Sequence, residues 1–113
     1  MTAEALISQR SRDRIFTHFA CRLKSRFGIE GVALKLWRHL AMLHHRQDWA
    51  QLVPVARLNR TGRRLFFVRL ADGRPMWVVF DTRLGVPITV YCAGMDIQPQ
   101  GFEPILLTDP AHA

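Results

Sequence analysis

The stretch RLFFVRLADGRPMWVVF, residues 64–80, carries the clearest signal of the fold. Its two arms, residues 64–70 and 76–80, are rich in aromatic and β-branched residues, which favour strands. Between the arms lies Ala71-Asp72-Gly73-Arg74, and Asp-Gly between two apolar arms is the strongest short-range indication of a hairpin. The stretch therefore predicts two antiparallel strands joined by a tight turn.

Two further strands are predicted on either side of this hairpin. Residues 52–58 form a weaker candidate that Pro54 interrupts, so we expect it at an edge of the sheet. The turn 59–62 joins it to the hairpin, and residues 81–85 connect the hairpin to a last strand over 87–91. Short strands separated by such close turns predict a β-meander.

Two helices are predicted before the sheet. Apolar residues recur at spacings of one, three and four between residues 11 and 27, and Ser11 is placed to cap this helix. Gly28 is expected to end it, and a second helical pattern runs from residue 30 to about residue 46. The fold class is therefore α+β: two N-terminal helices packed on a three- to four-stranded antiparallel β-meander.

The length of 113 residues suits one domain with one core. Residues 1–10 carry little pattern and are expected to form a flexible lead-in, and residues 11–94 the α+β domain. Residues 95–113 form a C-terminal tail with one apolar patch, residues 105–107. We expect this patch either to pack on the sheet or to stay mobile.

The chain is strongly basic, with a net charge of +7, and 14 of its 16 basic residues are arginines. Up to Val90 the 16 basic residues outweigh six acids and give +10, whereas the remaining residues carry −3. Arginine grips phosphate oxygens bidentately and stacks on bases, so this charge favours a polyanionic partner, with RNA first. A coding bias towards arginine would explain the ratio of arginine to lysine, but not the net charge.

Several classes of site lack the residues that they need. Cys21 and Cys92 stand among apolar neighbours, so both are expected in the core rather than in a disulfide framework. His39, His44 and His45 have no carboxylate or thiolate at ligand spacing, so we expect neither a metal nor another cofactor. No apolar run approaches the ~20 residues of a membrane span, and the first residues lack a signal-peptide pattern. We therefore expect a cytoplasmic protein.

The first helix carries a row of basic side chains. Arg14, His18, Arg22 and Arg26 follow one another at intervals of four, which places them on one helical face; we call this row the basic ridge. Like charges at this spacing repel each other, so an external anion would stabilise the ridge. The solvated face of an amphipathic helix has the same pattern, and the ridge alone does not separate the two interpretations.

Besides Arg14 on the ridge, three residues of the strands are candidate nucleic-acid contacts: Arg69, Trp77 and Tyr91. Alternation along the last strand puts Thr89 and Tyr91 on one face and Ile88 and Val90 on the other. If the helices cover the face of Ile88 and Val90, these hydroxyls point outward, and a groove at the sheet edge would still collect them. A hydroxyl, a guanidinium and an imidazole around one phosphate are the groups that ribonucleolytic cleavage needs.

Three segments occur in a familiar order: HFACRLKSRFGI at residues 18–29, WVVFD at 77–81 and ITVY at 88–91. Over about residues 11–92 the chain thereby resembles small phage- and plasmid-encoded proteins of the RelE-like and barnase/colicin/EndoU-like ribonuclease toxin fold. Members typically open with a helix that carries a histidine and arginines before an RFGI-like end. They close with a VVYD- and ITVY-like strand pair.

The resemblance implies metal-independent cleavage of RNA by a toxin of a toxin–antitoxin system. His18 would be the general acid or base, and Thr89 would contact the oxyanion or the ribose 2′-hydroxyl. Arg22 and Arg26 would clamp the phosphate. The segment over residues 45–58 departs from the family in being more apolar than expected, and it would offer a surface to an antitoxin or another protein.

Two other hypotheses remain open. The first is a non-catalytic phage or mobile-element protein that binds and inhibits a host nucleic-acid-handling complex, as an anti-CRISPR-type inhibitor does, or that coats nucleic acid. The second is a structural component of a virion or scaffold, because an edge strand and an apolar insert favour self-association. This structural hypothesis explains the charge least well.

Overall fold

A computed structural model describes residues 3–112, and it confirms the predicted α+β class. The helices are α1 (Ala3–Phe27) and α2 (Ala33–His45). The strands of the main sheet are β1 (Val53–Arg57), β2 (Arg63–Arg69), β3 (Pro75–Asp81) and β4 (Val86–Tyr91). The tail holds a small hairpin of β5 (Asp96–Ile97) and β6 (Ile105–Leu106), followed by a single 3-10 turn over Pro110–His112. Among the described residues, no helix is both long and apolar enough to cross a membrane.

The main sheet is a meander in the order β1-β2-β3-β4, with antiparallel pairing throughout. The central hairpin turns where Asp72-Gly73 predicts it, with Leu70 N donating to Arg74 O at 2.9 Å. Gly73 has a φ of +89°, a conformation that glycine adopts without strain. Strand β1 is an edge strand, as Pro54 predicts, and its register with β2 shifts next to that proline.

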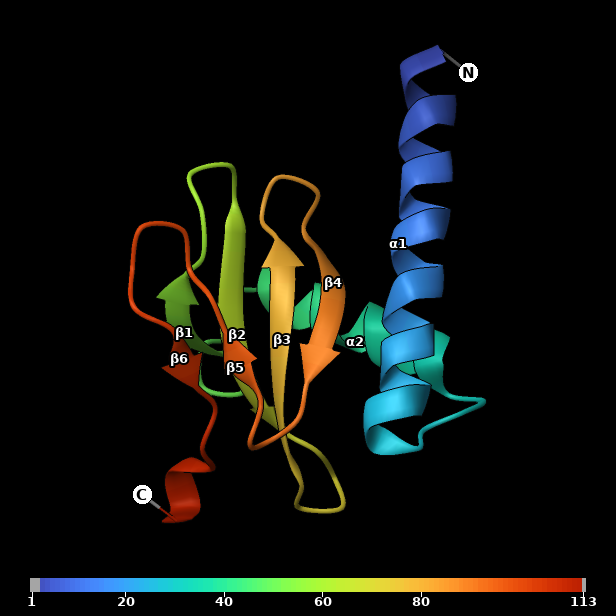
Figure 1. The fold of residues 1–113 in the computed structure, drawn as a ribbon. Helices are drawn as coiled ribbons and strands as arrows, with labels where there is room; N and C mark the ends of the chain where they lie inside the picture. The colour runs from blue at the N-terminus through green and yellow to red at the C-terminus, as the bar shows by residue number, and fades with distance from the viewer. Residues whose placement is uncertain (1–2, 113) are drawn as a thin grey trace.

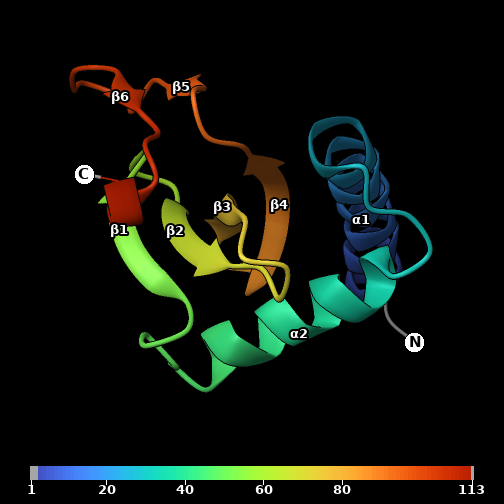
Figure 2. The same ribbon diagram turned by 90° about the horizontal axis from the view of Figure 1, so that it is seen from below.

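One face of the sheet packs on the helices (Figures 1 and 2). Helix α2 crosses this face, and α1 runs alongside β4. The buried side chains that meet here form the helix-side core: Phe19, Leu23, Phe27, Leu40, Leu43, Leu52, Phe66, Val68, Met76, Val78, Phe80 and Val90. Burying one large apolar side chain stabilises a fold by about 1.5–3 kcal/mol, so this core fixes α1 against the sheet.

Helix α1 differs in two respects from the sequence-based expectation. It begins at Ala3, so residues 3–10 are helical and Ser11 lies inside the helix instead of capping it. The first two residues of the expected lead-in lie outside the described part of the chain. Cys21, expected in the core, is exposed, because it lies about 200° around the helix from the buried Phe19. Gly28 ends the helix as predicted.

The C-terminal tail covers the other face of the sheet, opposite α2 (Figure 2). Ile97 and Leu107 pack there on Leu65, Trp77 and Val79, and we call this cluster the tail-side core. Leu107 is 1% exposed, which shows that the tail is part of the packed structure. Of the two alternatives for the tail, packing on the sheet is therefore the one observed.

The prediction that Ile88 and Val90 share a face of β4 is wrong. The register between β3 and β4 shifts between Val79 and Phe80, and Ile88 is the extra residue of the resulting bulge. Ile88 therefore packs with the tail-side core, whereas Val90 belongs to the helix-side core. Thr89 pairs with Val79, whose side chain also lies in the tail-side core.

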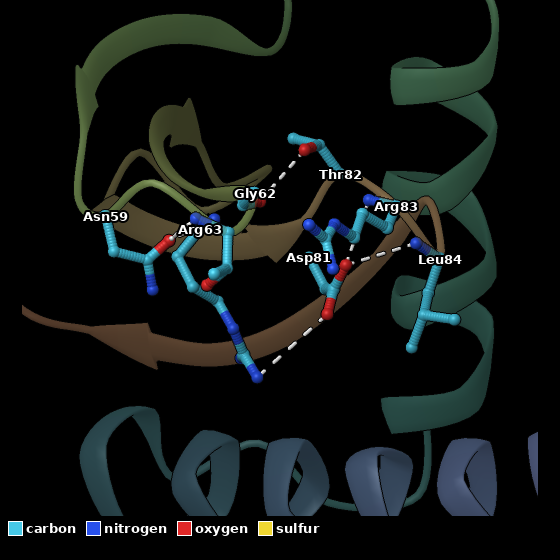
Figure 3. Close-up of polar contacts among 8 residues, drawn as sticks. Asn59, Gly62, Arg63, Asp81, Thr82, Arg83 and Leu84 are labelled. Carbon is cyan, nitrogen blue, oxygen red and sulfur yellow. Dashed lines mark hydrogen bonds and ion pairs between the residues drawn. The ribbon is translucent and has the colours of Figure 1, made fainter.

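Two connections at the same end of the sheet are joined by hydrogen bonds (Figure 3). Thr82 N and Thr82 Oγ1 both donate to Gly62 O, at 2.8 and 2.9 Å. Asp81 Oδ1 accepts from Arg83 N and Leu84 N within its own turn, at 2.9 and 3.1 Å. The β1–β2 and β3–β4 connections thus form one hydrogen-bonded unit.

Candidate nucleic-acid interface

The basic ridge lies on helix α1, which the helix-side core holds against β4. Both ribbon views place α1 next to β4, the edge strand opposite β1 (Figures 1 and 2). Arg14, His18 and Arg22 are exposed, whereas Arg26 is half-buried. The ridge therefore runs from solvent toward the sheet, and it reaches the sheet at Arg26.

Arg26 is the residue that joins the ridge to the sheet. Its Nη1 donates to the backbone oxygen of Val90 at 2.6 Å. Its guanidinium carbon lies 4.7 Å from the ring centre of Tyr91, a cation–π contact. An edge strand leaves backbone groups unpaired, and Arg26 satisfies one of them. Arg26 and the predicted contact Tyr91 are thus brought together, and both are tied to the framework.

The side chains of the other three ridge residues are exposed to solvent. Within the described side chains, neither Arg14 nor Arg22 forms an ion pair with a carboxylate, and neither does His18. The ion pair on α1 joins Lys24 Nζ to Glu30 Oε1 at 2.8 Å, and its hydrogen bond and charge raise the pKa of Lys24. The exposed part of the ridge is therefore two guanidinium groups and an imidazole without an ion-pair partner among the described side chains.

Thr89 is not part of this exposed set. Its residue is 8% exposed, and it lies opposite Val79 in the β3–β4 pairing, on the tail side of the sheet. Regular alternation from Val90, which pairs with Val78 on the helix side, determines this placement. A phosphate bound to the exposed ridge would therefore meet His18 and Arg22 before it met the Thr89 hydroxyl.

Arg69 and Trp77 belong to the attachment of the tail. Arg69 Nη1 and Nη2 bind the two carboxylate oxygens of Asp109 at 2.8 and 2.9 Å, a bidentate pair. Trp77 is 3% exposed and meets Phe67 edge to face, with ring centres 5.3 Å apart. The tail thus covers the face on which a nucleic-acid base would have to stack on Trp77.

His44 is held in an aromatic cluster of the helix-side core. Its ring stacks on Phe80 with centres 4.8 Å apart, and it meets Phe66 edge to face at 5.9 Å. Burial and then the positive charge of Arg64 lower the pKa of His44, with a smaller contribution from His45. Across the described residues, no three His, Cys, Asp or Glu side chains are grouped to hold a metal ion.

A second basic surface, which the sequence-based analysis missed, lies between α1, α2 and the β3–β4 turn. This groove has a volume of about 650 Å³, and its lining combines polar and aromatic residues: Arg12, Asp13, Arg38, His45, Phe16 and Trp37. The rings of Phe16 and Trp37 meet edge to face, with centres 5.6 Å apart. Arg38 and His45 are seven residues apart, two turns along α2, and this spacing is the feature of the sequence that places both on one face of the helix. Their proximity to Arg12 depends on how the helices pack.

Comparison with family models, curated proteins and solved structures finds no match for this chain. The structure defines a small α+β protein with two N-terminal helices on a four-stranded antiparallel meander and an added hairpin.

Proposed function

We propose that this protein binds RNA along the basic ridge of helix α1. The observation that carries the proposal is the exposure of Arg14, His18 and Arg22 in one row without a carboxylate partner among the described side chains. Guanidinium groups bind phosphate oxygens bidentately, and neutralising phosphates releases counterions, which favours binding. The net charge of +7 adds a long-range attraction for any polyanion.

We further propose that His18 and Arg22 cleave the bound RNA without a metal. The resemblance to RelE-like and barnase/colicin/EndoU-like ribonuclease toxins supports this step, and so does the exposure of both side chains one helical turn apart. An imidazole can take the proton of a ribose 2′-hydroxyl as that oxygen bonds to phosphorus, and the resulting imidazolium can give the proton to the 5′-oxygen as the P–O5′ bond breaks. A guanidinium can stabilise the charge that develops on the phosphate. Thr89 and Trp77 are buried, so the proposal does not depend on them.

Purified protein incubated with a labelled RNA in EDTA tests the cleavage step. We expect cleavage by the wild-type protein, and loss of cleavage in His18→Ala and in Arg22→Ala. His39→Ala is the matched control, because it removes another exposed histidine from α2. Cleavage that persists in His18→Ala would contradict the catalytic role, and equal loss in His39→Ala would remove the assignment to the ridge.

A second candidate function is inhibition of a host nucleic-acid-handling complex by direct binding, without turnover. Exposed apolar side chains at the β1 edge favour it: Trp49 is 40% exposed, Val53 40% and Val55 43%. Such a patch is typical of a protein-binding surface. If this function holds, a host protein co-purifies after nuclease treatment, Val55→Glu releases it, and His18→Ala does not.

A further inference from the structure

A cleft lies between the β1–β2 connection and the loop that joins β5 to β6. Both of these loops lie on the side of the sheet away from α1 (Figure 1). The volume of the cleft is about 670 Å³. The side chains that line it include two guanidinium groups, two amides and one aromatic ring, from Arg57, Arg60, Asn59, Gln100 and Phe102. These are the groups with which proteins bind single-stranded nucleotides.

The ring of Phe102 is exposed on a loop that is fixed on both sides. Gln100 N donates to Leu58 O at 2.7 Å, which ties the loop to the end of β1. Gln98 Nε2 donates to Phe102 O at 2.6 Å, and Phe102 N donates to Pro99 O at 3.3 Å. The backbone of Phe102 is therefore held in place while its residue remains 73% exposed. Such an arrangement presents an aromatic ring to a ligand on a backbone that needs no ordering on binding.

The opposite wall of the cleft is also ordered. Asn59 Oδ1 accepts hydrogen bonds from Thr61 N and Arg63 N, both at 3.0 Å (Figure 3). These bonds orient the side-chain amide and leave its nitrogen to donate to a ligand. Arg57 Nε donates to Asn59 O at 3.3 Å, which leaves the two terminal nitrogens of Arg57 for a ligand. Within the described side chains, no carboxylate forms an ion pair with Arg57 or Arg60.

We propose that this cleft binds one unstacked nucleotide of a single-stranded RNA. The base stacks on Phe102, the amides of Asn59 and Gln100 bind the base edge, and the guanidinium groups of Arg57 and Arg60 bind the adjacent phosphate. The inference rests on the proposed RNA-binding function and adds a preference for single strands. An acidic peptide would use the two arginines but would gain less from the aromatic face and the amides.

Fluorescence anisotropy with two labelled RNAs tests the cleft. The probes are a 2′-O-methyl oligouridine, in which the 2′-oxygen is blocked against cleavage, and a hairpin duplex of equal phosphate number. We expect Phe102→Ala to weaken binding of the single strand about tenfold, as loss of one stacked base does, and to leave duplex binding unchanged. Phe102→Tyr keeps the ring and restores affinity to within about twofold of the wild type. Leu106→Ala is the matched control, because Leu106 is 59% exposed on the same hairpin and lies outside the cleft lining.

The outcomes separate the cleft from the ridge. If the wild-type protein binds both RNAs and Phe102→Ala binds them equally well, the proposal for the cleft is overturned. The proposal for the ridge then stands. Single-strand binding that depends on Phe102 but not on Arg22 supports the cleft and overturns the ridge. Binding of neither RNA overturns both. An oligoglutamate probe that binds as tightly as oligouridine, with the same dependence on Phe102, overturns the nucleotide assignment.

Discussion

Arg26 and Tyr91 lie in direct contact, with the guanidinium 4.7 Å from the ring centre, and the same guanidinium donates to the backbone oxygen of Val90 at 2.6 Å. One residue of the basic ridge is thus part of the framework, whereas Arg22, one turn earlier on α1, is exposed. The two arginines are expected to respond differently to removal of their side chains.

Arg26→Ala is expected to lower the free energy of unfolding by about 1–3 kcal/mol, because it removes a charged hydrogen bond to a strand edge. Arg22→Ala, at an exposed position, is expected to stay within about 0.5 kcal/mol of the wild type. Urea denaturation followed by circular dichroism measures both. Equal stability of the two variants would mean that the Arg26 contacts do not hold α1 to β4.

Arg22→Ala is instead expected to change RNA binding. Removing one phosphate contact lowers the slope of log K against log salt by about 0.7 for a single strand, and the affinity falls with it. Anisotropy over a series of salt concentrations measures the slope. Arg46→Ala, an exposed arginine just after α2, is the control of equal charge. The same change of slope in Arg46→Ala would indicate binding spread over the whole basic surface.

His44 is expected to make stability depend on pH. Burial and the charge of Arg64 lower its pKa in the folded protein, so the unfolded chain, with a histidine pKa of about 6.5, binds the proton more readily. The free energy of unfolding therefore falls as pH drops from about 6.5 toward the lowered pKa, and it is level above that range. His44→Phe keeps an aromatic ring on Phe80 and removes this dependence.

An NMR titration checks the same point directly. The His44 ring is expected to titrate below the ordinary histidine range, and Arg64→Ala raises its pKa by removing the second-largest cause. An ordinary pKa for His44 in the wild type would show that its ring is not held in the aromatic cluster.

The bidentate pair between Arg69 and Asp109 is expected to hold the tail on the sheet. Arg69 is 39% exposed, so solvent screens the pair, and Asp109→Asn is expected to change global stability only slightly. Local opening is more sensitive: the amide hydrogens of Gly94 and Leu107, which bond across the tail hairpin, are expected to exchange faster. Glu30→Gln breaks the exposed pair with Lys24, far from the tail, and is expected to leave these two amides unchanged.

Gly62 is expected to be the least replaceable glycine of the turns. A Cβ at this position would lie 3.0 Å from Thr82 Oγ1, and the φ of +100° is one that side chains rarely adopt. Gly73, with a φ of +89° and nothing within 4 Å of an added Cβ, is the matched control. Both alanine variants carry backbone strain of about 1–2 kcal/mol, and Gly62→Ala is expected to lose more stability than Gly73→Ala. Equal losses of stability in the two variants, measured by thermal unfolding, would show that the β1–β2 and β3–β4 connections can move apart at little cost.

The helices and the meander were predictable because local signals agree with the global fold. The Asp72-Gly73 turn lies between two arms of strand formers, and Pro54 marks an edge strand. The apolar spacing around Phe19 likewise identifies the face of α1 that packs on the sheet. None of these features depends on a distant part of the chain.

The surroundings of the candidate site depend on long-range packing, and they were predicted less well. Strand β3 is buried on both faces, with Trp77 and Val79 on the side opposite Val78, and such a strand indicates that both faces are covered. That signal was present in the sequence, but it does not say that the tail is the cover. The bulge at Ile88 moves that side chain to the tail side, and although Pro87 beside it is a residue found at edge strands and bulges, it does not give the shift in register.

Because α1 lies over strand β4 and its Arg26 engages the outer backbone there, the four-stranded sheet keeps a single open side, at β1, where Val53 and Val55 are exposed. A sheet that grows from molecule to molecule by edge-to-edge pairing needs a free edge strand on both sides of every molecule. Two copies that joined through β1 would use up their free strands and stop at a pair. Strand-to-strand assembly of the main sheet would therefore be self-limiting, and it would leave the basic ridge of each copy on the outer flank.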